Sequence, residues 1–151
     1  MPDQTTPDKR VVSVSRFIPA PPEAIFAILS DATKHQLIDG SGTVQSSQSN
    51  ESEPLQLGTK FGMNMKIAVP YRITNTVVEF EQDRLIAWRH FGGHRWRYRL
   101  EPVEGGTEVT ESFDWSTARV PRGIELMGYP SKHPASMEKT LERLEQILSA
   151  D

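Results

Sequence analysis

The sequence contains no cysteine. A chain without cysteine has no disulfide framework, no thiolate metal site and no cysteine nucleophile. It also lacks any apolar run near the ~18 residues of a membrane-spanning helix. Its first ten residues are polar and do not resemble a secretory signal. These absences predict a cytoplasmic protein with no membrane span.

An excess or a block of positive charge is also missing. The net charge is −3, and no block of lysine or arginine occurs. A protein that binds nucleic acid needs the opposite balance, because clustered cations attract the phosphates. The sequence motifs of phosphate-binding loops, dinucleotide sites, zinc peptidases and α/β-hydrolases are missing as well. We therefore expect no nucleic-acid partner, no nucleotide chemistry and no cofactor.

The composition fits one domain of mixed α and β structure. The chain has 151 residues, of which 36% are hydrophobic and 25% charged, close to the shares of ordinary globular chains. Residues 1–9 are polar and show no periodicity, which predicts a disordered N-terminal tail. Residues 10–151 are expected to form the single domain.

The first half of the domain predicts one strand and two short helices. Residues 10–18 are β-branched and alternate, as in a strand, and the prolines that follow end it. Residues 23–29 and 32–37 have the apolar spacing and capping residues of two short helices with almost no loop between them. The serine-rich residues 40–54 hold either a weak edge strand near 42–48 or a flexible loop.

After Gly58 the sequence predicts an antiparallel meander and a final helix. Two Gly-Gly steps separate strongly alternating runs, which is a hairpin signal. Residues 116–133 carry prolines, glycines and apolar side chains, and we expect them to pack as a lid. Met137, Leu141, Leu144 and Leu148 recur at helical spacing, with Pro134 expected in the first turn. The predicted strands cover residues 61–67, 71–80, 84–91, 94–100 and 107–115.

The segments at the two ends of the domain are similar to a known family. Residues 18–26 (IPAPPEAIF), residues 105–111 (GGTEVTE) and the C-terminal amphipathic helix resemble the START-like, or polyketide cyclase/dehydrase-like (SRPBCC), superfamily. The resemblance covers residues 10–150. It implies an α+β helix-grip fold, in which a curved antiparallel sheet of about six to seven strands wraps around the long C-terminal helix and encloses a hydrophobic cavity. The family shares no catalytic motif, so the resemblance does not name a reaction.

Strand alternation predicts which side chains face that cavity. On residues 94–100 the aromatic residues share one face and the arginines the other, which belongs in water. On the next strand Glu111 lies between Val109 and Phe113 on the inner face. A buried carboxyl group there needs a hydrogen-bond partner, such as a tyrosine, a histidine or Arg89. Glu111 is either a ligand-orienting or acid/base group, or a structural carboxyl in a hydrogen-bond network.

The register of residues 84–91 depends on the turn that follows them. A two-residue turn at Gly92-Gly93 places Leu85, Ala87 and Arg89 inside, whereas a three-residue turn places Ile86, Trp88 and His90 inside. We favour the first register, since the neighbouring strand then offers apolar partners. His90 and His94 flank this turn, but no third metal ligand accompanies them, so no metal site is expected.

The sequence thus gives two sets of candidate site residues. The catalytic candidates are Glu111, Tyr98 and His90. The residues expected to line a ligand-binding cavity are Met63, Met65, Arg89, Trp96, Tyr98, Glu111, Phe113, Trp115, Met127, Leu141 and Leu144.

Three functions fit this pattern. The first is binding of a hydrophobic small molecule, of lipid, polyketide or isoprenoid type, by a carrier or sensor. The second is a polyketide cyclase, aromatase or dehydratase that uses acid/base residues in the cavity. The third is a protein-interaction module of co-chaperone type. The sequence favours the first, and a homodimer is compatible with it.

Overall fold

The computed structural model describes residues 10–40, 44–47, 54–66, 69–89, 92–126 and 128–149. The predicted tail at residues 1–9 lies outside these ranges, as do His90 and Met127.

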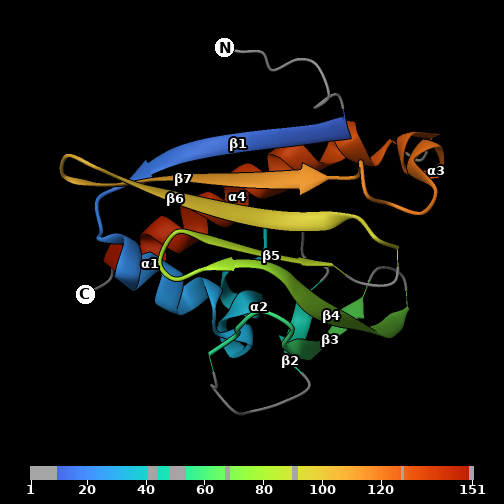
Figure 1. Cartoon of the computed structure of the whole chain (residues 1–151), viewed down its shortest axis with the longest axis horizontal. Helices are drawn as coiled ribbons and strands as arrows, with labels where there is room; N and C mark the ends of the chain where they lie inside the picture. Colours follow the sequence, from blue (N-terminus) through green and yellow to red (C-terminus); the bar gives the residue numbers. More distant parts are fainter. Residues whose placement is uncertain are drawn as a thin grey trace.

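Seven strands of the described chain form one curved antiparallel sheet (Figure 1). Their order in the sheet is β1-β7-β6-β5-β4-β3-β2. Strands β2 to β7 therefore each pair with the next strand in the sequence, and β1 pairs with β7 at the other edge of the sheet. The sheet confirms the predicted curved antiparallel architecture. Of the two alternatives for residues 40–54, the edge strand is the one found, over Val44–Ser47. The strands are β1 (Val11–Ile18), β2 (Val44–Ser47), β3 (Lys60–Lys66), β4 (Pro70–Glu81), β5 (Leu85–Arg89), β6 (Arg95–Val103) and β7 (Gly106–Asp114).

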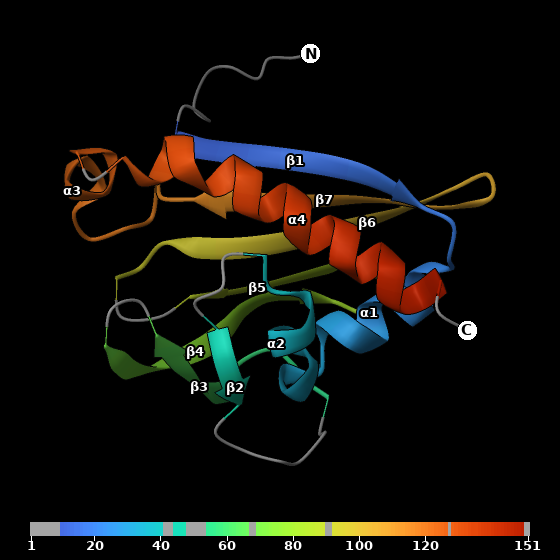
Figure 2. The same ribbon diagram turned by 180° about the vertical axis from the view of Figure 1, so that it is seen from behind.

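Helices pack against the concave side of this sheet (Figure 2). Helix α4 contacts β1 and β7, α1 contacts β6, and α2 contacts β2 at the opposite edge. Pro22 begins α1, where its missing N–H costs no hydrogen bond, and the Asp31 carboxylate caps the next turn by accepting from Thr33 N at 3.0 Å. This is the predicted helix-grip arrangement. The helices are α1 (Pro22–Leu29), η2 (Ala32–Lys34), α2 (His35–Ile38), α3 (Pro121–Leu126) and α4 (Tyr129–Ser149).

Helix α4 is longer than the sequence pattern suggested. It begins at Tyr129, so Pro134 lies inside the helix and not in its first turn. Proline lacks the N–H that would bond to the carbonyl group four residues earlier. The described part of the expected lid, residues 116–133, contains a turn at 116–120, then α3 and the beginning of α4. Leu126 at the end of α3 is 88% exposed, whereas Ile124 packs against buried residues.

The apolar stripe of α4 forms much of the core. Met137, Leu141 and Leu144 are buried, and Leu148 packs partly buried against the same cluster. Leu141 and Leu144 join side chains from α1 and from the inner face of the sheet, while Met137 joins a smaller cluster around Phe113. The predicted helix stripe is therefore confirmed.

The convex face carries a cluster of charges that ties three strands together. The Glu79 carboxylate on β4 accepts hydrogen bonds from Arg95 at 2.6 Å and from Arg97 at 2.8 and 2.7 Å. Arg97 also donates to Asp114 on β7 at 3.1 Å. The hydrogen bond from Arg97 is the main cause that lowers the pKa of Glu79 to about 2. The arginines of β6 thus lie outside, as alternation predicts.

The register expected for β5 was wrong. Arg89 is exposed and pairs with Arg95 of β6, while Ile86 and Trp88 face inward opposite Tyr98 and Trp96. Two irregularities explain the error. A β-bulge in β4 between Val77 and Glu79 shifts the alternation by one residue. In addition, Arg89 and Arg95 form the last β5–β6 pair, so the connection between these strands has five residues, 90–94, and not two.

The core position of α4 gives a stability prediction. Leu144 is fully buried, so Leu144→Ala removes apolar burial and leaves a cavity, which should cost about 2–5 kcal/mol of unfolding free energy. Leu126→Ala, on an exposed leucine, is the matched control and should change it by less than ~0.5 kcal/mol. Urea titrations of the two variants check this, and equal midpoints would contradict the packing of α4.

Candidate functional site

A cavity of about 510 Å³ lies between the concave face of the sheet and the helices α2 and α4. Most of its lining is apolar or aromatic, which suits an organic ligand. The apolar and aromatic lining residues include Ile38, Val44, Met63, Met65, Ile73, Trp88, Trp96, Phe113, Ile124 and Met137.

Aromatic rings form two groups around the cavity. In the first, Trp88 stacks on His35 with ring centres 4.7 Å apart and meets Phe61 and Tyr98 at 5.6 and 5.7 Å. In the second, Phe113 meets Trp96 at 4.7 Å, and two histidines pack against the same rings. Cross-strand pairing of Trp88 with Trp96 joins the two groups into one wall. The cavity therefore offers flat faces to a planar ligand.

His35 is a neutral member of the first group. Its Nε2 donates to the carbonyl oxygen of Leu29 at 2.8 Å, and the side chain is buried. Burial lowers the pKa of His35, because an imidazolium would lose its hydration there. The ring therefore orders the junction of α1 and α2 and presents an uncharged face to Trp88.

Glu111 is a buried acidic residue of the cavity wall. It is 3% exposed, and its Oε2 accepts a hydrogen bond from the Tyr98 hydroxyl at 3.0 Å. Its other oxygen, Oε1, is buried without a hydrogen-bond partner. The expectation that Glu111 is buried with a tyrosine, arginine or histidine partner is confirmed, and the partner is a tyrosine. Unlike a salt-bridged carboxylate, this group has no cation beside it in the described part of the chain to hold it ionised.

The surroundings of Glu111 favour its protonated form. Burial is the main cause that raises the pKa of Glu111 to about 8, and the charge of Asp39 adds to the effect, while the hydrogen bond from Tyr98 opposes it. Burial, together with the charge of Glu111, also raises the pKa of Tyr98. At neutral pH the pair therefore consists mainly of a carboxylic acid and a phenol.

Six of the eleven predicted lining residues border the cavity. They are Met63, Met65, Trp96, Tyr98, Glu111 and Phe113.

The other five predicted residues do not join this set. Leu141 and Leu144 are buried in the adjoining core, and Arg89 lies on the opposite face of the sheet. Trp115 stacks on Phe113, and its Nε1 donates a hydrogen bond to the Glu125 carboxylate at 2.7 Å. Met127 and the catalytic candidate His90 are outside the described residues.

Several lining residues were not predicted. Asn75 follows from the alternation of Tyr71, Ile73 and Asn75 on β4, a signal that was available in the sequence. His35 and Asp39 could not be found in this way, because their positions depend on how α2 packs over the sheet. Among the described residues, no cluster of histidine and acidic side chains has the makings of a metal site.

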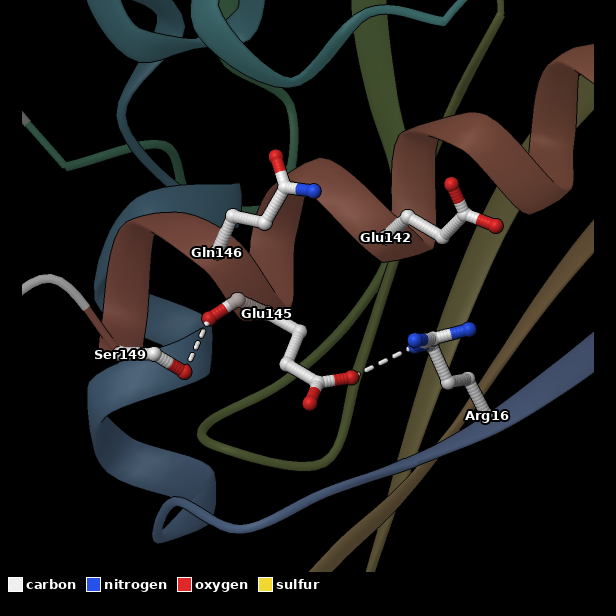
Figure 3. A pocket seen from close by; sticks show the side chains of 5 residues that line it. All are labelled: Arg16, Glu142, Glu145, Gln146 and Ser149. Carbon is white, nitrogen blue, oxygen red and sulfur yellow. Dashed lines mark hydrogen bonds and ion pairs between the residues drawn. The ribbon is translucent and has the colours of Figure 1, made fainter.

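A second hollow, of about 400 Å³, lies outside the sheet between β1 and α4 (Figure 3). Its lining residues are polar, and the Arg16 guanidinium donates to Glu145 at 2.6 Å. Ser149 bonds to the backbone carbonyl of Glu145 within the same helix. Because these groups already bond to each other near solvent, we assign the candidate site to the internal cavity.

The raised pKa of Glu111 predicts a pH dependence of stability. The folded state keeps the proton up to a pH of about 8, whereas the unfolded chain releases it near 4.5. Unfolding therefore releases a proton in this window, and the contribution of Glu111 to stability falls as pH rises through it. Glu111→Gln removes this pH-dependent contribution. The unfolding free energy of the variant, measured relative to that of the wild type, should therefore rise as the pH rises through this window.

Urea titrations across this window test the prediction. Glu108→Gln, which replaces an exposed glutamate of the same strand, is the matched control and should follow the wild type. His35 also has a shifted pKa, but its contribution to the pH dependence of the unfolding free energy is the same in all three proteins and cancels in the comparison. If the unfolding free energies of Glu111→Gln and the wild type differ by the same amount at every pH in this window, then Glu111 is ionised throughout it and the prediction is wrong.

Comparisons with known proteins agree with this architecture. The uncharacterized protein Rv0088 of Mycobacterium tuberculosis is 38% identical over 141 residues, which cover 88% of this chain and 62% of that protein. The chain thus spans about three fifths of the length of this curated relative. A crystal structure from Rhodobacter sphaeroides matches with a TM-score of 0.72 and 21% identity, covering 96% of both chains. An AHSA1-like protein from Aeromonas hydrophila matches with a TM-score of 0.67 and 18% identity, covering 93% of this chain and 92% of its own.

The structural matches show the same fold at low identity. No helix among the described residues has the length and apolar character needed to cross a membrane. The family model described as "Polyketide cyclase / dehydrase and lipid transport" matches residues 9–148, nearly the whole chain. With the helix-grip fold and its internal cavity, this match confirms the resemblance seen in the sequence: the chain belongs to the polyketide cyclase/dehydrase and lipid transport family.

Proposed function

We propose that this protein binds a hydrophobic small molecule of lipid, polyketide or isoprenoid type in its internal cavity, as a carrier or sensor. The observation that carries the proposal is the cavity of about 510 Å³, a volume within the usual ~300–1,000 Å³ of ligand sites. Its aromatic walls and the methionines Met63, Met65 and Met137 supply apolar contact area that adapts to different shapes.

The hollow interior supports small-molecule binding over a protein-interaction module. A module that grips a protein partner would need an exposed apolar surface over a filled core. Here the large apolar area lies inside, between the sheet and α4. The likeness to the AHSA1-like protein is a likeness of fold and does not carry its partners to this chain.

A second candidate function is acid/base catalysis on a polyketide-like chain. It is supported by Glu111, a buried carboxylic acid with one unpartnered oxygen beside the Tyr98 hydroxyl. A group that is protonated at neutral pH and lies in a dry site is suited to give a proton to a carbonyl oxygen or a leaving hydroxyl. The enzyme and the carrier would thus use the same cavity and differ in whether Glu111 moves a proton.

Native mass spectrometry of protein purified from its own host tests the binding proposal. We expect a mass increase that denaturation removes, and an apolar molecule in the organic extract. Ser136→Phe places a ring in the cavity and should abolish retention, whereas Ser116→Phe, on an exposed loop, should not. Absence of any retained molecule, together with no uptake of apolar probes by the wild type, would overturn the proposal.

Glu111→Gln separates the carrier from the enzyme. An amide keeps the hydrogen-bonding shape but cannot deliver a proton. If the extracted molecule is a product, the wild type should form it from its precursor and Glu111→Gln should bind that precursor without turnover. If the protein is a carrier, the extracted molecule should be unchanged by either protein.

A further inference from the structure

We infer that the ligand of this cavity is uncharged and presents an oxygen acceptor, of ketone, ester or amide type, to Oε1 of Glu111. The inference rests on the proposed binding function and specifies the polar group of the ligand. It is carried by three features of the cavity: an unpartnered carboxyl oxygen, a phenol whose proton is already used, and the absence of a buried cation among the described lining residues.

The first feature is the unpartnered oxygen. Glu111 Oε1 is fully buried and has no hydrogen-bond partner among the described residues, although Glu111 borders the cavity. A buried polar atom without a partner costs free energy, so nearly all such atoms in folded proteins are satisfied. Tyr98 bonds to the other oxygen, and since Glu111 borders the cavity, a ligand there can supply the missing partner.

The second feature is the direction of the hydrogen bond. The Tyr98 hydroxyl donates its one proton to Oε2, so it has none left for the ligand. When Glu111 is a carboxylic acid, its proton is available on Oε1, because Oε2 already accepts from Tyr98. The raised pKa of Glu111 keeps that form at neutral pH. The ligand atom opposite Oε1 must therefore be an acceptor.

The third feature is the charge around Glu111. Tyr98 on β6 faces Glu111, and the negative charge of Asp39, the residue after α2, also acts on Glu111.

The histidines of the cavity pack against neighbouring rings. His94 and His133 pack against Phe113, which follows Glu111 by two residues on β7, and His35 stacks on Trp88. The described residues of α4 nearest the core there, Met137, Thr140 and Leu141, do not titrate.

This arrangement disfavours a ligand with a negative charge. Arg72 is the single arginine or lysine among the described lining residues, and it is exposed. A carboxylate placed near Glu111 would therefore meet Asp39 and no buried cation, and burying an unpaired charge is costly. The site should reject free fatty acids and accept neutral carbonyl compounds of similar shape.

An amine is the competing class, because aromatic walls and carboxyl groups also attract cations. The two classes predict opposite pH effects. A carbonyl ligand needs protonated Glu111 and loses affinity as pH rises through about 8, whereas an ammonium ligand needs the carboxylate and gains affinity. Glu111→Gln keeps an N–H donor for a carbonyl group but offers no charge to an amine.

Calorimetric titration with a matched set of naphthalenes tests the inference. The four probes carry an acetyl, an isopropyl, a carboxylate or an aminomethyl group at the same ring position. Isopropyl is the apolar isostere of acetyl and reports cavity binding alone. The proteins are the wild type, Glu111→Gln, Glu111→Leu, and the control Glu108→Gln. The double variant Tyr98→Phe/Glu111→Leu removes both partners and guards against misfolding of the single leucine variant.

The expected result is specific to the acetyl probe. Its affinity should fall about threefold to tenfold in Glu111→Leu and in the double variant, the effect of one hydrogen bond. It should stay within about twofold in Glu111→Gln and Glu108→Gln, and the isopropyl probe should not weaken in any variant. In the wild type, acetyl binding should weaken as pH rises through about 8, and in Glu111→Gln it should not.

Other outcomes separate the inference from the function on which it rests. If the isopropyl probe binds but the acetyl probe is indifferent to Glu111→Leu, the inference fails and the binding function stands. Naphthoate binding as tight as acetyl binding, or aminomethyl binding that rises with pH and disappears in Glu111→Gln, also overturns the inference alone. Failure of all four probes to bind the wild type counts against the binding function itself.

Discussion

A seven-stranded sheet is wider than the helix that covers it. Six strand spacings of ~4.8 Å give a width of about 29 Å, whereas one helix with its side chains is about 10–12 Å across. Helix α4 therefore covers the β1 and β7 side, while α1 contacts β6 and α2 contacts β2 at the opposite edge. The cavity lies in the space that these helices leave over the concave face, bordered by the sheet, α2 and α4.

The same sheet holds two glutamates in opposite protonation states. Glu79 on the convex face accepts from two arginines, and its pKa is lowered to about 2. Glu111 on the concave face has a phenol as its partner, and its pKa is raised to about 8. For Glu79 the hydrogen bond from Arg97 outweighs the effect of burial, whereas for Glu111 burial outweighs the hydrogen bond from Tyr98. Strand alternation places the arginines of β6 on the convex face and its aromatic rings on the concave face.

Local alternation was enough to predict the faces of β6 and β7, since both strands are regular over their whole length. It failed for β5 because the bulge before Glu79 and the long connection after Arg89 each break the two-residue period. Burial of Glu111 followed from its neighbours in sequence. The roles of His35 and Asp39 did not, because they depend on the packing of α2 across the sheet, which no short-range pattern encodes.

The three tryptophans of the chain occupy related places in this structure. Trp88 and Trp96 border the cavity, and Trp115 stacks on Phe113, which borders it too. The indole rings therefore lie in or next to the same apolar space, and none is on a remote surface. Intrinsic fluorescence of the unlabelled protein is consequently a built-in reporter of that space: its emission depends on whether water or an organic molecule fills the cavity.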